Sequence, residues 1–146
     1  MKLAADFPML FDPKRNARAR EAEALTIDYE RTRLNHLGID KELEWAGLDD
    51  CLAGYDVLSY DPGKPAPTNR MIEVTSAIPS PLRFIVARNE WEQAQKLGTA
   101  YVFHVWDMQK PTPVLYERTI AQVARHIPTD NGDGRWLSVE IPLDNE

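Results

Sequence analysis

The sequence predicts an α/β domain in which a mixed β-sheet is flanked by helices. Three observations support this fold class. A long segment, 15–37, lacks Gly and Pro and is rich in helix-forming residues. Two strand-like runs, 55–60 and 70–77, are joined by a loop rich in Pro and Gly. Further along, a strand, a short helix and the most strand-like run of the chain follow one another, which is the order of a crossover onto a sheet.

Length and composition indicate one ordinary globular domain. The chain has 146 residues, of which 43% are apolar and 27% are charged, and its formal net charge is −6. No apolar run approaches the ~20 residues needed to span a bilayer. We therefore expect a cytoplasmic location and no membrane partner. We expect residues 1–19 to form a lead-in and residues 20–146 to form a single domain.

The first helix is expected over residues 15–37, because Gly38 follows it where a helix-ending residue is favoured. Its start overlaps the basic run 14-KRNARAR-20, which is either a solvated helix start or a patch that contacts phosphates. A short strand containing Leu43 and Trp45 is expected after the helix.

The elements beyond the hairpin are inferred from alternation and from turn residues. They are strands at 82–87, 100–108 and 135–143 and helices at 89–98 and 114–125. In the helix at 89–98, Asn89 is the expected N-cap residue and Glu92 completes a capping box. Gly98 ends this helix.

The hairpin predicts which polar residues meet. If the 61–68 loop is symmetrical, Asp56 lies opposite Glu73, and opposed side chains on neighbouring strands are about 5 Å apart at Cβ. Two carboxylates at that distance repel each other unless a cation lies between them, as in a divalent-metal site. In the alternative interpretation, Asp56 is a turn residue and Glu73 pairs with Arg70 or Arg83 at a sheet edge.

Other reactive residue types are expected to have structural roles. Cys51 is the single cysteine, and the neighbouring Asp49 and Asp50 would raise a thiol pKa rather than lower it, which disfavours a catalytic role. His104 lies within a predicted strand and is expected to be a satisfied interior histidine rather than a ligand. The tryptophans are expected to pack in or beside the core rather than to stack on bases. They are Trp45, Trp91, Trp106 and Trp136.

The order of several segments resembles a known domain family. These segments are 23-EALTIDYERTRLNHLG-38, 54-GYDVLSYD-61, 72-IEVTSA-77 and 84-FIVARNEWEQAQKLGTAYVFHVW-106. Together they are similar to the domain found at the C-terminus of the plant protein NO VEIN and in many bacterial proteins. The similarity extends over about residues 20 to 110.

That family in turn resembles the restriction-endonuclease-like superfamily, the PD-(D/E)xK nucleases. The resemblance implies a restriction-endonuclease-like fold and makes Asp56 and Glu73 ligands of Mg²⁺ or Mn²⁺. A carboxylate on the first helix would help to hold the metal, with Glu30 as the first candidate and Glu23 as the second. Such a metal activates water and stabilises charge that develops on a phosphate.

The chain departs from the superfamily pattern at one position. The lysine expected two residues after Glu73 is Thr75, which cannot supply a positive charge. Losing one positioned electrostatic contact commonly costs ~10²–10³ in rate. Arg83, Arg88 and Lys64 are candidates for a relocated cation, and Arg88 is the best placed of them.

Two functions from different classes follow. In the first, the domain is a degenerate nuclease fold that recognises nucleic acid or a protein partner without cutting, within a restriction or defence system or as part of a larger parent polypeptide. In the second, it is an active endonuclease for DNA or RNA that uses Mg²⁺ or Mn²⁺. The catalytic set is then Asp56, Glu73, Thr75 and Arg88. The sequence indicates no oligomeric state.

Overall fold

The structure is a computed structural model that describes residues 13–46 and 54–143. Its elements in chain order are α2 (Pro13–Leu37), β1 (Val57–Asp61), β2 (Thr68–Ser76), β3 (Arg83–Ala87), α4 (Arg88–Leu97), a 3₁₀ turn (Gly98–Ala100), β4 (Tyr101–Asp107), β5 (Val114–Thr119), α5 (Ile120–Ala124) and β6 (Ser138–Pro142). Cys51 and its two aspartate neighbours lie outside the described residues. Within those residues, no helix is both long and apolar enough to cross a membrane.

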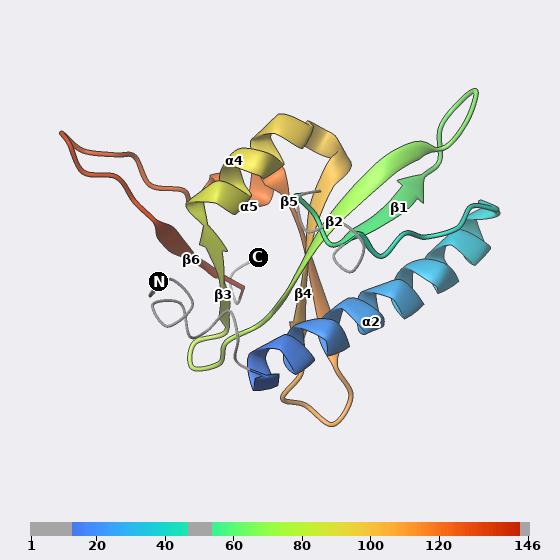
Figure 1. The fold of residues 1–146 in the computed structure, drawn as a ribbon, viewed down its shortest axis with the longest axis horizontal. Coiled ribbons are helices and arrows are strands. Elements are labelled where there is room, and N and C mark those ends of the chain that lie inside the picture. The colour runs from blue at the N-terminus through green and yellow to red at the C-terminus, as the bar shows by residue number, and fades with distance from the viewer. Residues whose placement is uncertain (1–12, 47–53, 144–146) are drawn as a thin grey trace, which may run out of the picture.

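A four-stranded mixed sheet forms the centre of the molecule, in the order β1-β2-β4-β5. The β1–β2 and β4–β5 pairs are antiparallel, and the central β2–β4 pair is parallel. Helix α2 packs on one face against β1 and β2, whereas α4 and α5 lie on the other side (Figure 1). The predicted mixed sheet with flanking helices is therefore confirmed.

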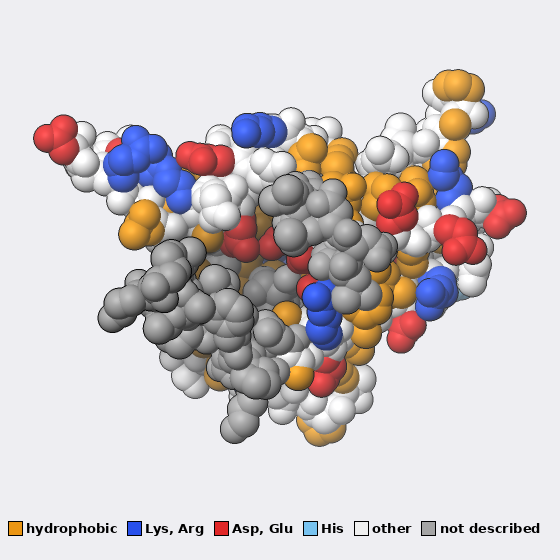
Figure 2. Space-filling model, in the orientation of Figure 1, with side chains coloured by type: hydrophobic (Ala, Val, Ile, Leu, Met, Phe, Trp, Pro, Cys, Tyr) orange, Lys and Arg blue, Asp and Glu red, His pale blue; other side chains and the backbone are white. Residues whose placement is uncertain are grey.

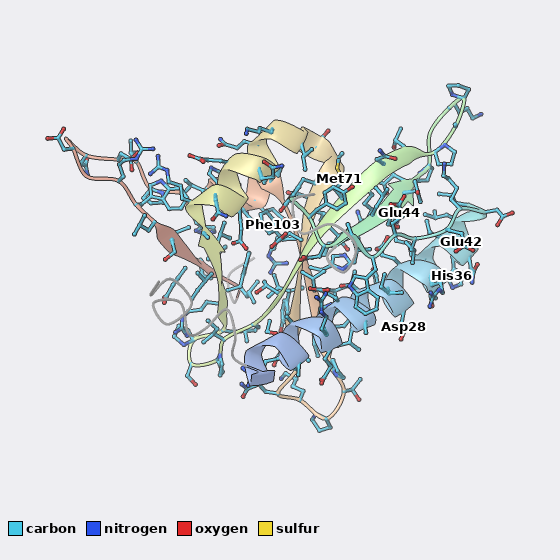
Figure 3. All side chains as sticks on the ribbon, in the orientation of Figure 1. Asp28, His36, Glu42, Glu44, Met71 and Phe103 are labelled. Atoms are coloured by element: carbon cyan, nitrogen blue, oxygen red, sulfur yellow. The ribbon has the colours of Figure 1, made fainter. Side chains whose placement is uncertain are left out.

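Two apolar cores separate the layers. One core lies between α2 and the sheet, and its buried residues are Ala22, Ile27, Val57, Ile72, Val74, Val102 and Trp106. The other lies on the α4 side and includes Phe84, Trp91, Ala94, Tyr101, Phe103, Val105 and Val123. Successive residues of β4 alternate between the two cores, so every residue of this strand is buried. Figure 3 shows Met71 and Phe103 on the α4 side and Asp28 and His36 along the outside of α2.

The predicted first helix, hairpin and central strand are all present. Gly38 and Gly98 follow α2 and α4 with φ of 71° and 69°, a left-handed conformation that glycine adopts without steric cost. Helix α2 begins at Pro13, so the expected boundary at residue 19 falls inside it. All four tryptophans are buried or half-buried, as expected.

Three local predictions are wrong. Helix α4 begins at Arg88, so Ala87 is its N-cap residue in place of Asn89, and the Glu90 carboxylate accepts a hydrogen bond from the Ala87 amide at 2.8 Å. The segment 114–125 is not one helix, because its first half pairs with β4 as β5 and only the remainder forms α5. No strand contains Leu43 and Trp45 among the described residues, where a single bridge joins Glu44 to Leu58.

The crossover also differs from the expected one. Strand β3 does not join the main sheet but pairs with β6 in a separate antiparallel ribbon, which stands at one side of the molecule (Figure 1). The two parallel strands that the crossover links are β2 and β4, with β3 and α4 between them in the chain.

Candidate functional site

The hairpin has the symmetrical register that the sequence predicts. Val57 pairs with Ile72, and the pairing continues to Asp61 and Thr68 at the loop. Asp56 lies just before β1, where its amide donates to the Ile72 carbonyl at 2.9 Å and its Oδ2 accepts from the Val74 amide at 2.8 Å. Both bonds fix the Asp56 carboxylate beside the middle of β2.

Asp56 and Glu73 line one pocket of about 630 Å³. Its other lining residues are Arg18, Ala19, Glu23, Val74, Thr75, Ser76, Ile78, Ile85 and Glu90. Four carboxylates from four separate segments thus face one space. On the face shown in Figure 2, acidic side chains occupy the hollow between the α4 side and the α2 side of the molecule.

Burial and the neighbouring negative charges raise the pKa values of two carboxyl groups in this pocket. Burial raises the pKa of Asp56 to about 7, opposed by the Val74 amide, and the charges of Glu23 and Glu90 raise it further. Burial also raises the pKa of Glu73 well above its ordinary value, and the charges of Asp56 and Glu90 add to the effect. The site therefore favours bound protons or a bound cation.

Glu73 is held by two neighbours. The Tyr101 hydroxyl donates a hydrogen bond to Glu73 Oε1 at 3.3 Å, and the same hydroxyl reaches the Gly54 carbonyl at 3.3 Å. The Glu90 carboxyl group lies beside that of Glu73, and both its charge and its hydrogen bonding raise the pKa of Glu73. Tyr101 and Glu90 thereby fix the orientation of Glu73 toward the pocket.

The structure places Glu23, rather than Glu30, at this pocket. Glu23 is buried on α2, where its Oε1 accepts from Trp45 Nε1 at 2.6 Å and from Arg20 at 3.1 Å. The α2 carboxylate expected to assist Asp56 and Glu73 is thus the second candidate of the sequence prediction.

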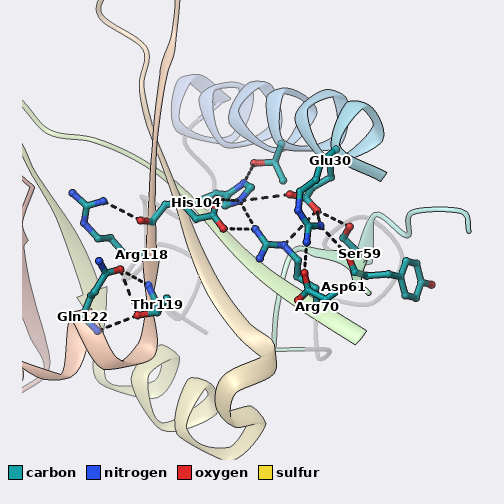
Figure 4. Close-up of polar contacts among 12 residues, drawn as sticks. Glu30, Ser59, Asp61, Arg70, His104, Arg118, Thr119 and Gln122 are labelled. Atoms are coloured by element: carbon teal, nitrogen blue, oxygen red, sulfur yellow. Dashed lines mark hydrogen bonds and ion pairs between the residues drawn. The ribbon is translucent and has the colours of Figure 1, made fainter. Parts of the chain in front are cut away.

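Glu30 belongs to a separate polar cluster between α2 and the sheet (Figure 4). It is fully buried, and its Oε1 accepts from Ser59 at 2.6 Å and from Arg33 at 2.9 Å. Arg70 Nε lies 3.4 Å from the same oxygen. The guanidinium groups of Arg33 and Arg70 both pair with the Glu30 carboxylate, so this cluster is a buried ion network.

His104 is part of this network and is confirmed as a buried strand histidine. Its Nδ1 lies 3.1 Å from Thr26 Oγ1, and its Nε2 lies 3.4 Å from Arg70. Burial and the positive charges of Arg70 and Arg33 lower the His104 pKa to about 3, so the ring stays neutral over the physiological range.

The alternative pairing of Glu73 with an arginine at a sheet edge is not observed. Arg70 pairs with Glu30 and Glu117, and Arg83 pairs with Glu140 at 3.1 Å. Neither arginine bridges Asp56 and Glu73.

The predicted substitute cation is also located elsewhere. Arg88 forms ion pairs with Asp130, at 2.6 Å, and with Glu92, and it lies over the Trp136 ring at 5.0 Å. It therefore fastens the 128–137 segment to α4 and is not among the residues that line the pocket. Arg83 and Lys64 are not among those residues either. Thr75 lines the pocket, and the basic residue that lines it is Arg18 of α2.

The donor set fits a divalent cation of the Mg²⁺ type. The described residues contain no group of three or more His, Cys, Asp or Glu side chains arranged to hold a metal ion. Mg²⁺ requires less than that, because it is usually bound by one or two carboxylates and keeps several waters. Asp56 and Glu73 supply two hard oxygen ligands, and burial raises the pKa of both carboxyl groups.

The sequence analysis missed Glu90. The Asn-Glu-Trp segment at the start of the predicted helix contains this carboxylate, but the predicted helix start at Asn89 does not place it at the hairpin. With the helix starting one residue earlier, Glu90 occupies the first turn of α4 and faces the pocket.

Fold and site together define a mixed α/β domain with a carboxylate pocket beside its central hairpin. Comparison with known families extends this description. The chain belongs to the family described as Protein NO VEIN, C-terminal, which matches residues 22–117 and so includes all four pocket carboxylates. No curated protein and no solved structure matches the chain.

Proposed function

We propose that this domain has a restriction-endonuclease-like fold and binds a divalent cation at Asp56 and Glu73, and through it a phosphate of a nucleic acid. The observation that supports the proposal most is that these two carboxylates line one pocket, and that Arg70 and Arg83 pair with other carboxylates. Burying such a pair disfavours the folded state, and this cost is relieved when a cation is bound. The acidic net charge of −6 repels phosphates, and a bound cation in the pocket would offset this repulsion locally.

Each pocket residue has a distinct task in this proposal. Asp56 and Glu73 would hold the metal, Glu23 and Glu90 add negative charge to the same pocket, and Tyr101 orients Glu73. A bound Mg²⁺ or Mn²⁺ supplies Lewis acidity at a phosphate oxygen and lowers the pKa of a bound water.

In this proposal, Thr75 determines whether the bound nucleic acid is also cut. It lines the pocket at the position where the superfamily has lysine, and its hydroxyl is neutral. We therefore propose that the domain recognises nucleic acid and cuts it weakly or not at all, as a recognition module of a restriction or defence system or of a larger parent polypeptide. One observation favours the active endonuclease as a second candidate, since Arg18 brings a positive charge to the same pocket.

The test is a binding and cleavage assay on single- and double-stranded DNA and RNA. We expect binding in Mg²⁺ or Mn²⁺ that is lost in chelator and in Asp56→Ala, whereas Asp28→Ala, at an exposed position of α2, binds normally. Metal-dependent cutting that Asp56→Ala abolishes would select the endonuclease. Binding that is indifferent to metal and to Asp56 would contradict the metal-mediated contact in both functions. Absence of both binding and cutting would direct attention to a protein partner.

A further inference from the structure

A second cavity adjoins the carboxylate pocket. It has a volume of about 640 Å³ and is lined by Ala17, Arg18, Glu21, Ser76, Ala77, Ile78, Met108 and Gln109. Arg18, Ser76 and Ile78 line both cavities. The two spaces therefore meet along a boundary where the N-terminal part of α2 passes the end of β2.

The two cavities differ in chemistry. The carboxylate pocket carries four acidic side chains and one arginine, whereas the second cavity carries one of each sign, Glu21 and Arg18. Half of the residues lining the second cavity are apolar, and Gln109 and Ser76 add hydrogen-bonding groups. Such a mixture suits a neutral, flat ligand that has polar edges, and the volume lies in the range of small-molecule sites, ~300–1,000 Å³.

The Arg18 side chain lies at the boundary between the two cavities. It forms no ion pair or hydrogen bond with any residue that the structure describes, whereas Arg20 is held by Glu23 and Arg33 by Glu30. An exposed guanidinium beside an acidic pocket is suited to bind a phosphate that already contacts a cation in that pocket.

We propose that the second cavity is a nucleoside subsite, in which Arg18 contacts the phosphate shared with the carboxylate pocket and the adjoining base lies between Met108 and Gln109. The inference rests on the proposed function, because a metal at Asp56 and Glu73 is what brings the phosphate to the boundary. Ser76 Oγ lies 3.7 Å from Met108 Sδ and holds that side chain at the cavity wall. The ligand class is a polynucleotide bound through one phosphate and one neighbouring base.

The experiment measures fluorescence anisotropy of a labelled oligothymidylate and of its abasic counterpart, in Ca²⁺ so that binding is observed without turnover. Arg18→Ala is expected to weaken both oligonucleotides about tenfold and to lower the slope of log affinity against log salt by about one, as expected for one lost phosphate contact. Arg31→Ala, an exposed arginine on the same helix, is the matched control. Arg18→Lys should recover part of the affinity.

Gln109→Trp tests the base contact separately. The Gln109 side chain is exposed, and the hydrogen bond at this position is made by its backbone amide to Asp107, so the variant should fold. We expect it to weaken the oligothymidylate several-fold and to leave the abasic chain unaffected.

Three results would overturn the inference or its basis. If Arg18→Ala behaves like Arg31→Ala while binding still needs Asp56, the subsite is wrong and the metal site stands. Equal binding of the two oligonucleotides by wild type would exclude a base contact. If wild type binds neither oligonucleotide in Ca²⁺, the proposed function itself fails.

Discussion

At the scale of single residues, we propose that Thr75 separates recognition from cleavage. Thr75→Lys restores the positive charge that the superfamily places two residues after its second metal-binding carboxylate, and the side chain at this position faces the pocket. We expect it to raise Mg²⁺-dependent cleavage by about 10²-fold. Thr75→Met, which adds length without charge, is the control in the same gel assay. No gain with lysine in a protein that still binds metal would show that position 75 does not face the scissile phosphate.

Asp56 makes the metal-free protein sensitive to pH. Its pKa rises from 3.8 to about 7 on folding, so the folded state binds more protons than the unfolded state between these values. Stability conferred by this group therefore falls as pH rises from about 4 to about 7 and stays low above that.

Asp56→Asn should remove this penalty. At pH 8 without metal, the variant is expected to be more stable than wild type by about 1–2 kcal/mol, since one pKa unit corresponds to about 1.4 kcal/mol. Denaturant unfolding at pH 8 and at pH 4 measures the gain and its expected disappearance. Asp28→Asn, at an exposed position, should be neutral at both pH values. A destabilised Asp56→Asn protein would mean that the hydrogen bond from Val74 outweighs the repulsion.

At the scale of elements, α2 carries two polar clusters that differ in function. Glu23 and Glu30 lie seven residues apart, which is about 10 Å along the axis and nearly the same helix face. One therefore reaches the pocket and the other reaches the ion network of Arg33, Arg70 and His104.

Glu30→Gln tests this division. The variant leaves Arg70 without its buried carboxylate partner, so it should lose about 3–5 kcal/mol of stability. Its affinity for Mn²⁺ should be unchanged wherever it remains folded, because Glu30 does not line the pocket. Thermal unfolding and a metal titration below the transition give both quantities. Loss of metal binding in a folded Glu30→Gln protein would show that Glu30 contributes to the metal site.

The turn before β1 positions Asp56. Gly54 has a φ of 84°, and a Cβ at this position would lie 2.4 Å from the Gln93 side chain, so the side chain must move. Gly54→Ala should therefore cost more than the ~1 kcal/mol typical of backbone strain and should also weaken metal binding. Gly38→Ala has the same kind of φ with open space around it and should cost stability alone. Equal effects of both variants on metal affinity would argue against this positioning role.

At the scale of the whole molecule, the sequence predicts the helix and sheet layers more completely than it predicts which distant strands pair. The α2 helix, the hairpin register and the buried β4 strand follow from periodicity and turn residues, which are local signals. The separate β3–β6 ribbon does not, because its pairing joins segments distant in the chain. Residues 114–119 contain good helix formers, and their pairing with β4 overrides that preference.

The sequence predicts the part of the candidate site that lies on the hairpin, but not the part that depends on how α2 packs. The sequence predicts that a symmetrical hairpin brings Asp56 and Glu73 together, and the register agrees. The choice between Glu23 and Glu30 depends on how α2 lies across the sheet, and the placement of Arg18 depends on the same packing. Arg88 was a reasonable candidate by sequence proximity, but its partner Asp130 lies 42 residues away and could not be inferred from spacing.

The most direct test of the account is a Mn²⁺ titration of the purified chain, followed by electron paramagnetic resonance of the free ion. We predict one site in wild type whose affinity rises with pH through about 7, as Asp56 loses its proton. The site should be lost in an Asp56→Asn, Glu73→Gln double variant and retained in Glu30→Gln. A wild type that binds no Mn²⁺ at pH 8, or a double variant that binds it as well as wild type, would contradict the assignment of this pocket as a metal site.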